Sequence, residues 1–287
     1  MNGQGQDITA PSEIEVPFLY LVDTGETPVF RQTDAPADQG ALSGTREAHA
    51  MTIRNARLLP NEFSLDVEGF AFTAHDTGVA DFFDDAQLTA VYTPEVEALI
   101  ARLAGATEVA VFDHTRRSSD GAQREAHNWR GPVPLPHSDY TDTSAAQRMR
   151  DFFGDEADAR LKRRFAIVNV WRSMNEPIEQ WPVALCDARS VNDDLMLTIV
   201  RSAPHRAEPS FEYDRASETR HASYDANHRW FYFPRMTRNE VLLFKNYDTL
   251  QDGTARYALH SAFEDPNSPP DPAPRESIES RAFVFFD

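Results

Sequence analysis

The chain contains a single cysteine and no long uninterrupted apolar segment. Cys186 has no second cysteine to pair with, so an intramolecular disulfide is excluded, which fits a reducing cytoplasmic compartment. No stretch approaches the roughly 18 apolar residues that a membrane-spanning helix needs. The N-terminus also lacks the basic region and apolar run of a secretory signal. These absences predict a soluble protein of the cytoplasm.

Positive charge is also scarce. Lysine and arginine together number 28, against 46 aspartate and glutamate residues, so the formal net charge is −18. An acidic surface repels phosphate backbones and anionic lipids, so neither nucleic acid nor a membrane surface is an expected partner. The sequence has no internal repeat and no glycine-rich phosphate-binding loop. A small molecule is the partner that we expect.

Strand patterns dominate the 287 residues. Segments 1–14 and 25–50 are polar or rich in Gly, Asp, Thr and Pro, so we expect an N-terminal arm and irregular structure up to residue 50, with one short strand at 16–22. A single domain is expected from 51 to 287. Its helices are predicted at 93–104, closed by Gly105, and at 143–153, and residues 118–134 are expected to form a loop. Strands are predicted at 51–57, 70–74, 108–113, 164–172, 195–201, 230–233, 241–244, 256–263 and 278–286. This pattern indicates a mainly β sandwich or jelly roll with supporting helices.

The segment around His137 and Asp139 carries the clearest chemical signal. Residues two apart on a strand point to the same face, so an imidazole and a carboxylate in this spacing can grip one metal ion. The pair supplies two of the three ligands of a facial triad for non-haem Fe(II), whose third ligand is a distant histidine. Of the nine histidines, only His137 has an acidic residue two positions later.

A late strand is expected to carry the third metal ligand, and the segment after it is expected to bind an anion. His260 is the candidate third ligand, and Arg275 follows 15 positions later with Ser277 beyond it. A guanidinium can hold a carboxylate through two parallel hydrogen bonds, and a nearby hydroxyl adds a third. Such a pair suits the far carboxylate of 2-oxoglutarate while its keto-acid end chelates the metal. Arg281 is a rival for this carboxylate.

The order of these motifs resembles the Fe(II)/2-oxoglutarate-dependent oxygenase superfamily. More specifically, the chain resembles its hydroxylase/desaturase family, which includes the fungal gibberellin desaturase and a component of cephamycin methoxylation. The resemblance runs from about Met51 to the C-terminus. Eight segments carry it: 112–117, 137–141, 167–172, 182–187, 230–236, 244–248, 260–263 and 275–279.

The resemblance implies a double-stranded β-helix, which is a form of jelly roll. It implies that His137, Asp139 and His260 bind the metal and act in catalysis, and that Arg275 and Ser277 bind the co-substrate. Fe(II), 2-oxoglutarate and O₂ would be the cofactors and co-substrates. The reaction would be hydroxylation, desaturation or ring formation on a small molecule of specialised biosynthesis, and the carboxylate of Asp139 argues against halide transfer.

Several other residues are candidates for contact with the substrate. Asn169 and Trp171 share a face of the predicted strand 164–172, Tyr140 follows the metal-binding segment, and Arg116 lies near the end of the strand at 108–113. For His114 and Arg117 the alternatives are contact with the substrate and a solvated strand end, and for Tyr247 they are a site, turn or core position. Cys186 lies in an apolar run, where a thiol is a buried packing group rather than a nucleophile.

Two other functions fit the same residues. A jelly-roll binding or sensor protein could retain the metal site without turnover, in which case no 2-oxoglutarate would be converted to succinate. An iron dioxygenase that uses no keto acid would not require Arg275.

Overall fold

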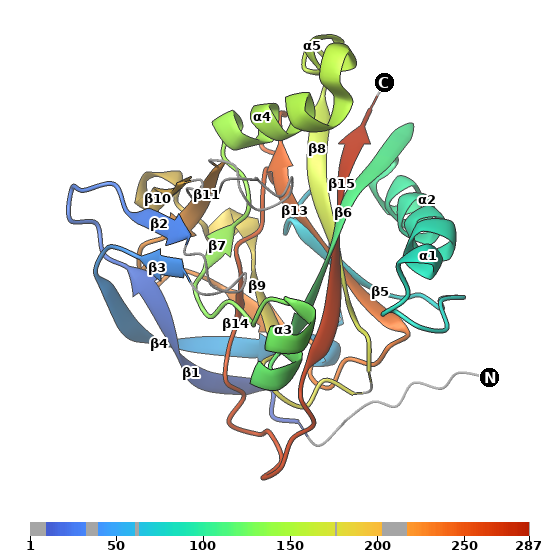
Figure 1. Cartoon of the computed structure of the whole chain (residues 1–287). Coiled ribbons are helices and arrows are strands. Elements are labelled where there is room, and N and C mark those ends of the chain that lie inside the picture. The colour runs from blue at the N-terminus through green and yellow to red at the C-terminus, as the bar shows by residue number, and fades with distance from the viewer. Residues whose placement is uncertain (1–9, 33–39, 61–62, 176, 203–216, 287) are drawn as a thin grey trace.

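A computed structural model describes residues 10–32, 40–60, 63–175, 177–202 and 217–286. Within them, two sheets face each other, and helices lie beside the smaller sheet and at one end (Figure 1). The larger sheet contains β1 (Glu13–Leu21), β4 (Arg46–Asn55), β12 (Trp230–Tyr232), β9 (Val183–Cys186), β14 (His260–Ala262), β7 (His137–Ser138), β11 (Ser217–Ala222), β10 (Met196–Ser202), β2 (Val29–Gln32) and β3 (Gly40–Leu42), in that order. The smaller sheet contains β5 (Phe70–Ala74), β13 (Glu240–Asp248), β8 (Phe165–Ser173), β15 (Glu276–Phe285) and β6 (Glu108–Ser118), in that order.

The helices are short. They are α1 (Asp85–Gln87), α2 (Thr93–Ala104), α3 (Gly121–His127), α4 (Asp142–Phe153) and α5 (Ala157–Arg160). Single turns of other helix types are η1 (Ala56–Leu58), η2 (Leu88–Tyr92), η3 (Gly154–Glu156), η4 (Ala188–Ser190) and η5 (Asp193–Leu195). No helix in the described part of the chain is long and apolar enough to cross a membrane.

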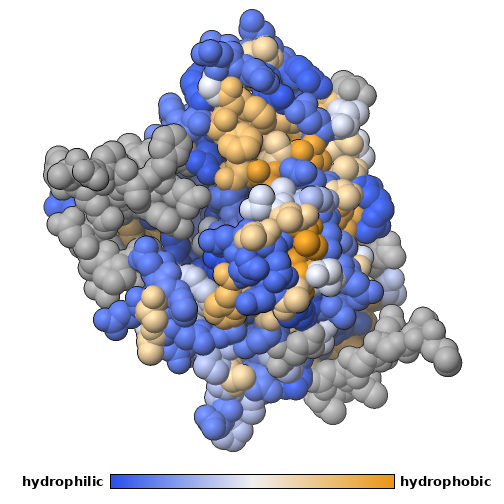
Figure 2. Space-filling model, turned by 45° about the vertical axis from the view of Figure 1, so that its right-hand side comes forward, coloured by the Kyte–Doolittle hydropathy of each residue, from blue (hydrophilic) through white to orange (hydrophobic). Residues whose placement is uncertain are grey.

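Apolar side chains from both sheets meet in the space between them. Trp171, Leu242 and Phe244 of the smaller sheet pack with Leu185 and Phe231 of the larger sheet. A separate cluster joins the outer face of the smaller sheet to α2. The two facing sheets confirm the predicted mainly β jelly roll with helical support. Most of the face in Figure 2 is hydrophilic, and apolar residues show only in limited areas, because most apolar side chains lie in these interior clusters.

The alternation predicted for β8 is confirmed. Ile167, Asn169 and Trp171 face the space between the sheets, whereas Val168 and Val170 belong to the cluster under α2. The predicted helix at 93–104 is also confirmed as α2. Gly105 ends it in the left-handed conformation that glycine adopts without a steric cost, with φ at 64°.

Several expectations from the sequence were wrong. The segment 25–50, expected to be irregular, contains β2, β3 and the first half of β4, and the expected division after residue 50 falls inside β4. Of the expected N-terminal arm, residues 1–9 lie outside the described part of the chain. The expected loop 118–134 contains α3, because Asp120 caps the helix by accepting a hydrogen bond from the Gln123 amide at 2.9 Å. The turn expected at Tyr247 and Asp248 lies within β13.

Strand β6 is longer than predicted, and this changes the position of His114. His114 lies inside the strand rather than at its end, and its ring connects α2 to the sheet. Its Nε2 lies 2.9 Å from Thr93 Oγ1, and its Nδ1 lies 2.7 Å from Ser280 Oγ. Burial lowers the pKa of His114 to about 4, while Asp113 opposes the shift and Arg116 adds to it. The folded protein therefore keeps this imidazole neutral at pH values where an exposed histidine is protonated.

We predict that His114 contributes to the acid sensitivity of the fold. Below pH 6.5 the unfolded chain takes up a proton that the folded ring rejects down to a pKa of about 4, so stability present above pH 6.5 is lost as the pH falls. Between pH 7 and pH 5 this one group should lower the free energy of unfolding by about 2 kcal/mol. Urea unfolding of the metal-free protein and of His114→Gln at both pH values measures the difference. Equal pH dependence in the two proteins would contradict the prediction.

Candidate metal centre

Strand β7 brings the two predicted histidine ligands together. His137 on β7 is the direct antiparallel partner of His260 on β14, and the ring centroids are 4.2 Å apart. Asp139 completes the group, because its Oδ1 lies 3.5 Å from His137 Nε2 and 3.9 Å from His260 Nε2. The potential ligand atoms of the three residues all lie within 4.8 Å of one another. The structure thus unites the three predicted ligands.

Backbone carbonyls orient both rings. His137 Nδ1 lies 2.7 Å from the Leu135 carbonyl oxygen, and His260 Nδ1 lies 3.5 Å from that of Ala258. A carbonyl oxygen only accepts, so each Nδ1 carries the hydrogen and each Nε2 presents a free lone pair toward Asp139. This is the tautomer that a metal ion needs at Nε2.

The protonation states of the three residues also suit a divalent cation. Burial lowers the pKa of His137 to about 3, with His260 adding to the shift, and burial lowers the pKa of His260 to about 4. For Asp139, burial acts to raise the pKa, but Arg281 and the two histidines outweigh it and hold the pKa well below the usual value. Two neutral imidazoles and one carboxylate form the donor set typical of non-haem Fe(II) with open coordination positions.

Asp139 reaches this group by a different route from the one expected. Strand β7 ends at Ser138, so the aspartate lies just beyond the strand. Asn246 on β13 holds it there: its Oδ1 accepts a hydrogen bond from the Asp139 amide at 2.9 Å, and its backbone oxygen accepts one from Ser138 Oγ at 2.9 Å. Sequence reasoning missed this role of Asn246, although the residue lies within one of the family-like segments.

The second oxygen of Asp139 points to the smaller sheet. Oδ2 accepts hydrogen bonds from Asn169 Nδ2 at 3.1 Å and from Arg281 Nε at 2.9 Å. Arg281 also contacts Asp113 at 3.1 Å, Thr115 Oγ1 at 2.9 Å and Glu279. Every nitrogen of this guanidinium therefore has a partner, and both Arg281 and Asn169 lie beside the metal ligands.

Arg275 differs from Arg281 in its partners. It is 2% exposed, and Nη1 donates to the Trp181 carbonyl oxygen at 2.6 Å. Its Nε and the Oγ of Ser277 are buried without a hydrogen-bond partner among the described residues. Burial lowers the pKa of Arg275 to about 9, and Arg117 adds to this shift while Glu279 opposes it. A buried cation with a donor that lacks a partner among the described residues favours an anion nearby, because an uncompensated buried charge costs several kcal/mol.

Trp171 forms a wall beside this site. The centre of the Arg275 guanidinium lies 5.7 Å from the centroid of the Trp171 ring. The positive charge of Arg117 acts on Arg275 and also on both metal-site histidines, whose pKa values it lowers.

Arg116 is not brought to the metal ligands. It is the strand partner of Ile278, whose side chain packs on the outer face of the smaller sheet. Its Nε donates to the Phe82 carbonyl oxygen at 2.7 Å, and Nη2 contacts Asp85 at 2.6 Å. The outward position follows from strand alternation, since neighbouring Thr115 faces Arg281 on the inner side.

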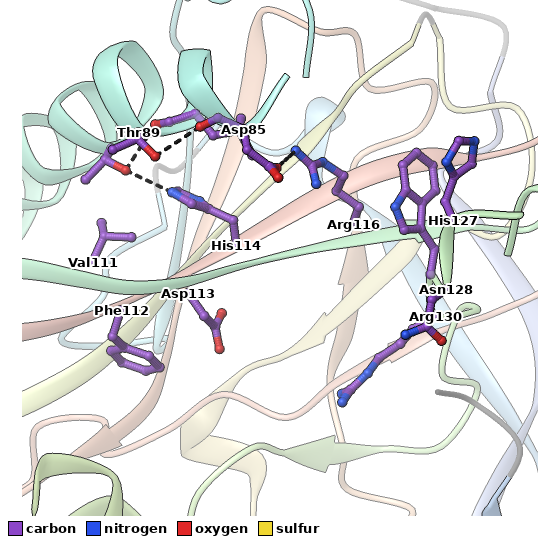
Figure 3. Close-up of a pocket in the computed structure, with 13 residues that line it drawn as sticks. Asp85, Thr89, Val111, Phe112, Asp113, His114, Arg116, His127, Asn128 and Arg130 are labelled. Atoms are coloured by element: carbon purple, nitrogen blue, oxygen red, sulfur yellow. Dashed lines mark hydrogen bonds and ion pairs between the residues drawn. The ribbon is translucent and has the colours of Figure 1, made fainter. Parts of the chain in front are cut away.

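A pocket of about 530 Å³ lies along the edge strand β6. Figure 3 shows His114 and Arg116 extending toward α1, while Asp113 extends to the other side of the strand, where it contacts Arg281. The pocket thus borders the outer end of the hydrogen-bond chain that leads through Arg281 to Asp139. It does not contain the three predicted metal ligands.

The remaining candidates are buried and packed in the core. Tyr140 is buried against Phe112, with ring centroids 6.4 Å apart, and burial raises its pKa. Tyr247 also packs in the core. Cys186 is fully buried, and burial raises the pKa of its thiol to about 12, which confirms a packing role.

His221 was not singled out from the sequence. It is the β11 partner of His137, and the two rings stack with centroids 5.3 Å apart. Its Nδ1 is buried without a hydrogen-bond partner among the described residues. The surrounding sequence offered no acidic neighbour or spacing that marked this histidine.

Comparisons with known proteins agree with this geometry. Residues 17–285 match a family described as "Oxidoreductase/YMDC permease-like domain". The chain is 33% identical to the hydroxylase/desaturase CTB9 of Cercospora beticola over 86% of its length and 80% of that protein. It is 30% identical to the Fe(II)/2-oxoglutarate-dependent dioxygenase nvfI of Aspergillus novofumigatus over 91% of its length and 92% of that protein.

The solved structure of an iron and α-ketoglutarate-dependent endoperoxidase, NvfI, has the same fold. The two structures superpose with a TM-score of 0.81 at 26% identity, covering 96% of this chain and 99% of the other. These similarities extend over most of the chain, and the family match at residues 17–285 spans His137, Asp139 and His260. The chain therefore belongs to the hydroxylase/desaturase family of Fe(II)/2-oxoglutarate-dependent dioxygenases.

Proposed function

We propose that this protein uses Fe(II), 2-oxoglutarate and O₂ to hydroxylate or desaturate a small molecule in specialised biosynthesis. The observation that carries this proposal is the pairing of two complementary features in one interior. One is a three-residue donor set with neutral imidazoles. The other is the buried Arg275, whose Nε has no hydrogen-bond partner among the described residues, as is also true of Ser277 Oγ. The charge of Arg117 acts on both histidines and on Arg275. The family relationship supports the same chemistry.

The donor set fits the metal that the family implies. His137 and His260 each offer Nε2, and Asp139 offers Oδ1. Three ligands on one side of an octahedral ion leave three positions for a chelating keto acid and O₂. When bound together, Fe(II), 2-oxoglutarate and O₂ supply an oxidant for a C–H bond, and 2-oxoglutarate is converted to succinate and CO₂.

Arg275 and Ser277 fit the far carboxylate of 2-oxoglutarate. Arg275 Nε and Ser277 Oγ have no hydrogen-bond partner in the described part of the chain, and Arg117 adds positive charge nearby. An anionic carboxylate would satisfy both donors and neutralise a charge that the fold leaves without an ion pair in the described residues. Arg281, the rival for this role, already contacts three carboxylates. We therefore assign the co-substrate to Arg275 and Ser277.

The protein also positions and shields the reaction. Trp171 covers one side of the Arg275 guanidinium, and the apolar cluster between the sheets excludes water around it. A drier site strengthens the interaction between the guanidinium and a carboxylate. We assign Tyr140 to the wall on the α4 side, where it packs with Phe112 and Phe283.

The relatives leave the outcome of the oxidation open. Their names include hydroxylase/desaturase, dioxygenase and endoperoxidase. Hydroxylation, desaturation and ring formation share the same metal and co-substrate and differ in how the substrate C–H bonds are held. The substrate class is a small molecule, and the acidic surface disfavours a nucleic acid.

We predict that Asp139→Ala will abolish turnover and leave the fold intact. Removing a ligand should lower succinate formation from 2-oxoglutarate more than about a hundredfold. Loss of a residue that only hydrogen-bonds to a metal ligand already lowers metal affinity or activity about tenfold to a hundredfold. The measurement compares succinate released with Fe(II), O₂ and candidate substrates, alongside circular dichroism. Asp158→Ala, which changes an exposed carboxylate on α5, is the control. If the unmodified protein binds metal and candidate substrates but forms no succinate, a binding or sensor protein would be favoured.

We predict that Arg275→Met will weaken 2-oxoglutarate binding to the metal-loaded protein about 30-fold or more. Removing one partner of a buried charged hydrogen-bond pair costs about 2–5 kcal/mol, and about 1.4 kcal/mol corresponds to tenfold. Arg116→Met is the matched control, because that arginine lies on the outer face of the sheet and contacts Asp85. Titration with 2-oxoglutarate under anaerobic conditions measures both. Unchanged affinity and activity in Arg275→Met would favour an iron dioxygenase that uses no keto acid.

A further inference from the structure

The two carboxylate oxygens of Asp139 have different surroundings. Oδ1 faces the Nε2 atoms of both histidines, at 3.5 Å and 3.9 Å. Oδ2 faces the opposite sheet and accepts hydrogen bonds from Asn169 and Arg281. The carboxylate thus presents one oxygen to the metal site and has the other engaged by two donors.

The two donors come from adjacent strands. Asn169 on β8 and Arg281 on β15 are direct register partners in the smaller sheet, and both side chains point into the interior. Asp139 follows a strand of the larger sheet, so these contacts connect the two sheets at the metal site. The donors lie on regular strands, which limits how far they can move with Asp139.

Arg281 is itself held on several sides. Asp113 and Thr115 contact Nη1, and Glu279 contacts Nη2. Its Nε is therefore directed at Asp139 by contacts that do not involve the metal ligands. The side chain is 7% exposed, so water competes little for these bonds.

We propose that Arg281 and Asn169 are positioning residues that keep Asp139 bound to the metal through Oδ1 alone. A carboxylate can bind a cation through one oxygen or both. Binding through both would occupy one of the three positions that 2-oxoglutarate and O₂ require. Engaging Oδ2 with a charged donor and a neutral donor opposes this rotation. This inference rests on the proposed function, since it concerns the positions left for the co-substrate.

Two kinds of variant separate geometry from charge. Asn169→Ala removes a neutral donor to Oδ2 and leaves every charge in place. Arg281→Lys keeps the positive charge but cannot contact Asp139, Asp113 and Glu279 together, because an ammonium lacks the planar fork. Arg172→Lys is the matched control. That buried arginine lies on β8 but on the outer face of the sheet, where Nη1 donates to the Arg238 carbonyl oxygen at 2.8 Å.

The experiment measures two affinities of the full-length protein under anaerobic conditions. The first is the affinity for Fe(II) alone. The second is the affinity of the Fe(II)-loaded protein for 2-oxoglutarate, followed by the visible absorption that a ferrous ion gains when a keto acid chelates it. We expect Asn169→Ala and Arg281→Lys to bind Fe(II) within about threefold of the unmodified protein, because a released Oδ2 can still bind the metal. We expect 2-oxoglutarate to bind about tenfold more weakly. If Oδ2 occupies a position that 2-oxoglutarate needs, the loss of binding free energy should be at least that of one hydrogen bond to a charged group.

Other patterns would overturn the proposal. Unchanged 2-oxoglutarate affinity in both variants would show that Oδ2 needs no restraint, and an equal loss of both affinities would indicate only a weakened site. If Arg281→Lys does not fold, Asn169→Ala decides alone, because it leaves Arg281 and its ion pairs in place. An unmodified Fe(II)-loaded protein that fails to bind 2-oxoglutarate would instead refute the proposed function.

Discussion

The site depends on the pairing of one two-residue strand. Strand β7 lies between β14 and β11, and its short length is enough to set His137 directly opposite His260. Cross-strand partners in an antiparallel pair have side chains on the same face within contact distance. The hydrogen bonds of the sheet therefore bring together two imidazoles that are far apart in the sequence. Asp139 leaves the strand immediately afterwards and crosses toward the second sheet, held by Asn246.

Arg281 lies on β15 and Arg275 directly precedes that strand. Both are buried cations, and their different partners give them different roles. Arg281 contacts three carboxylates, so its desolvation is offset and it serves to hold other groups. Arg275 is also buried, but its Nη1 donates to a backbone carbonyl, its Nε has no hydrogen-bond partner among the described residues, and the like charge of Arg117 acts on it more strongly than Glu279 does. In the first arrangement every guanidinium nitrogen has a partner, whereas in the second Nε has none among the described residues, which is why we propose an anion there. Their positions in sequence differ by six residues, and their chemistry differs because of what the neighbouring strands supply.

Much of the site could be predicted from the sequence because it follows local rules. The alternation of β8 and the end of α2 at Gly105 depend on residues close in the chain. The His-x-Asp motif identified the right pair, although Asp139 lies beyond the strand and Asn246 holds it in place. The choice between Arg275 and Arg281 could not be made in this way, since it depends on Asp113, Glu279 and other residues from separate strands. Arg116 was assigned to the substrate because β6 was predicted too short; in the longer strand, alternation sends it outward. His221 and Asn246 have neighbours that only the register of the sheets reveals.

The two sheets contribute different chemistry to the same interior. The larger sheet supplies the two neutral imidazoles, whose Nε2 lone pairs suit a transition-metal ion such as Fe(II). The smaller sheet and the segment leading into it supply the donors, namely Asn169, Arg281, Arg275 and Ser277. Among the described residues, Asp139 has Oδ1 near both imidazoles and Oδ2 bonded to Asn169 and Arg281, so it has one oxygen toward each sheet. A change in the spacing or twist of the sheets would therefore move this carboxylate relative to the histidines. The packing of the core between the sheets thus also sets the geometry of the metal site.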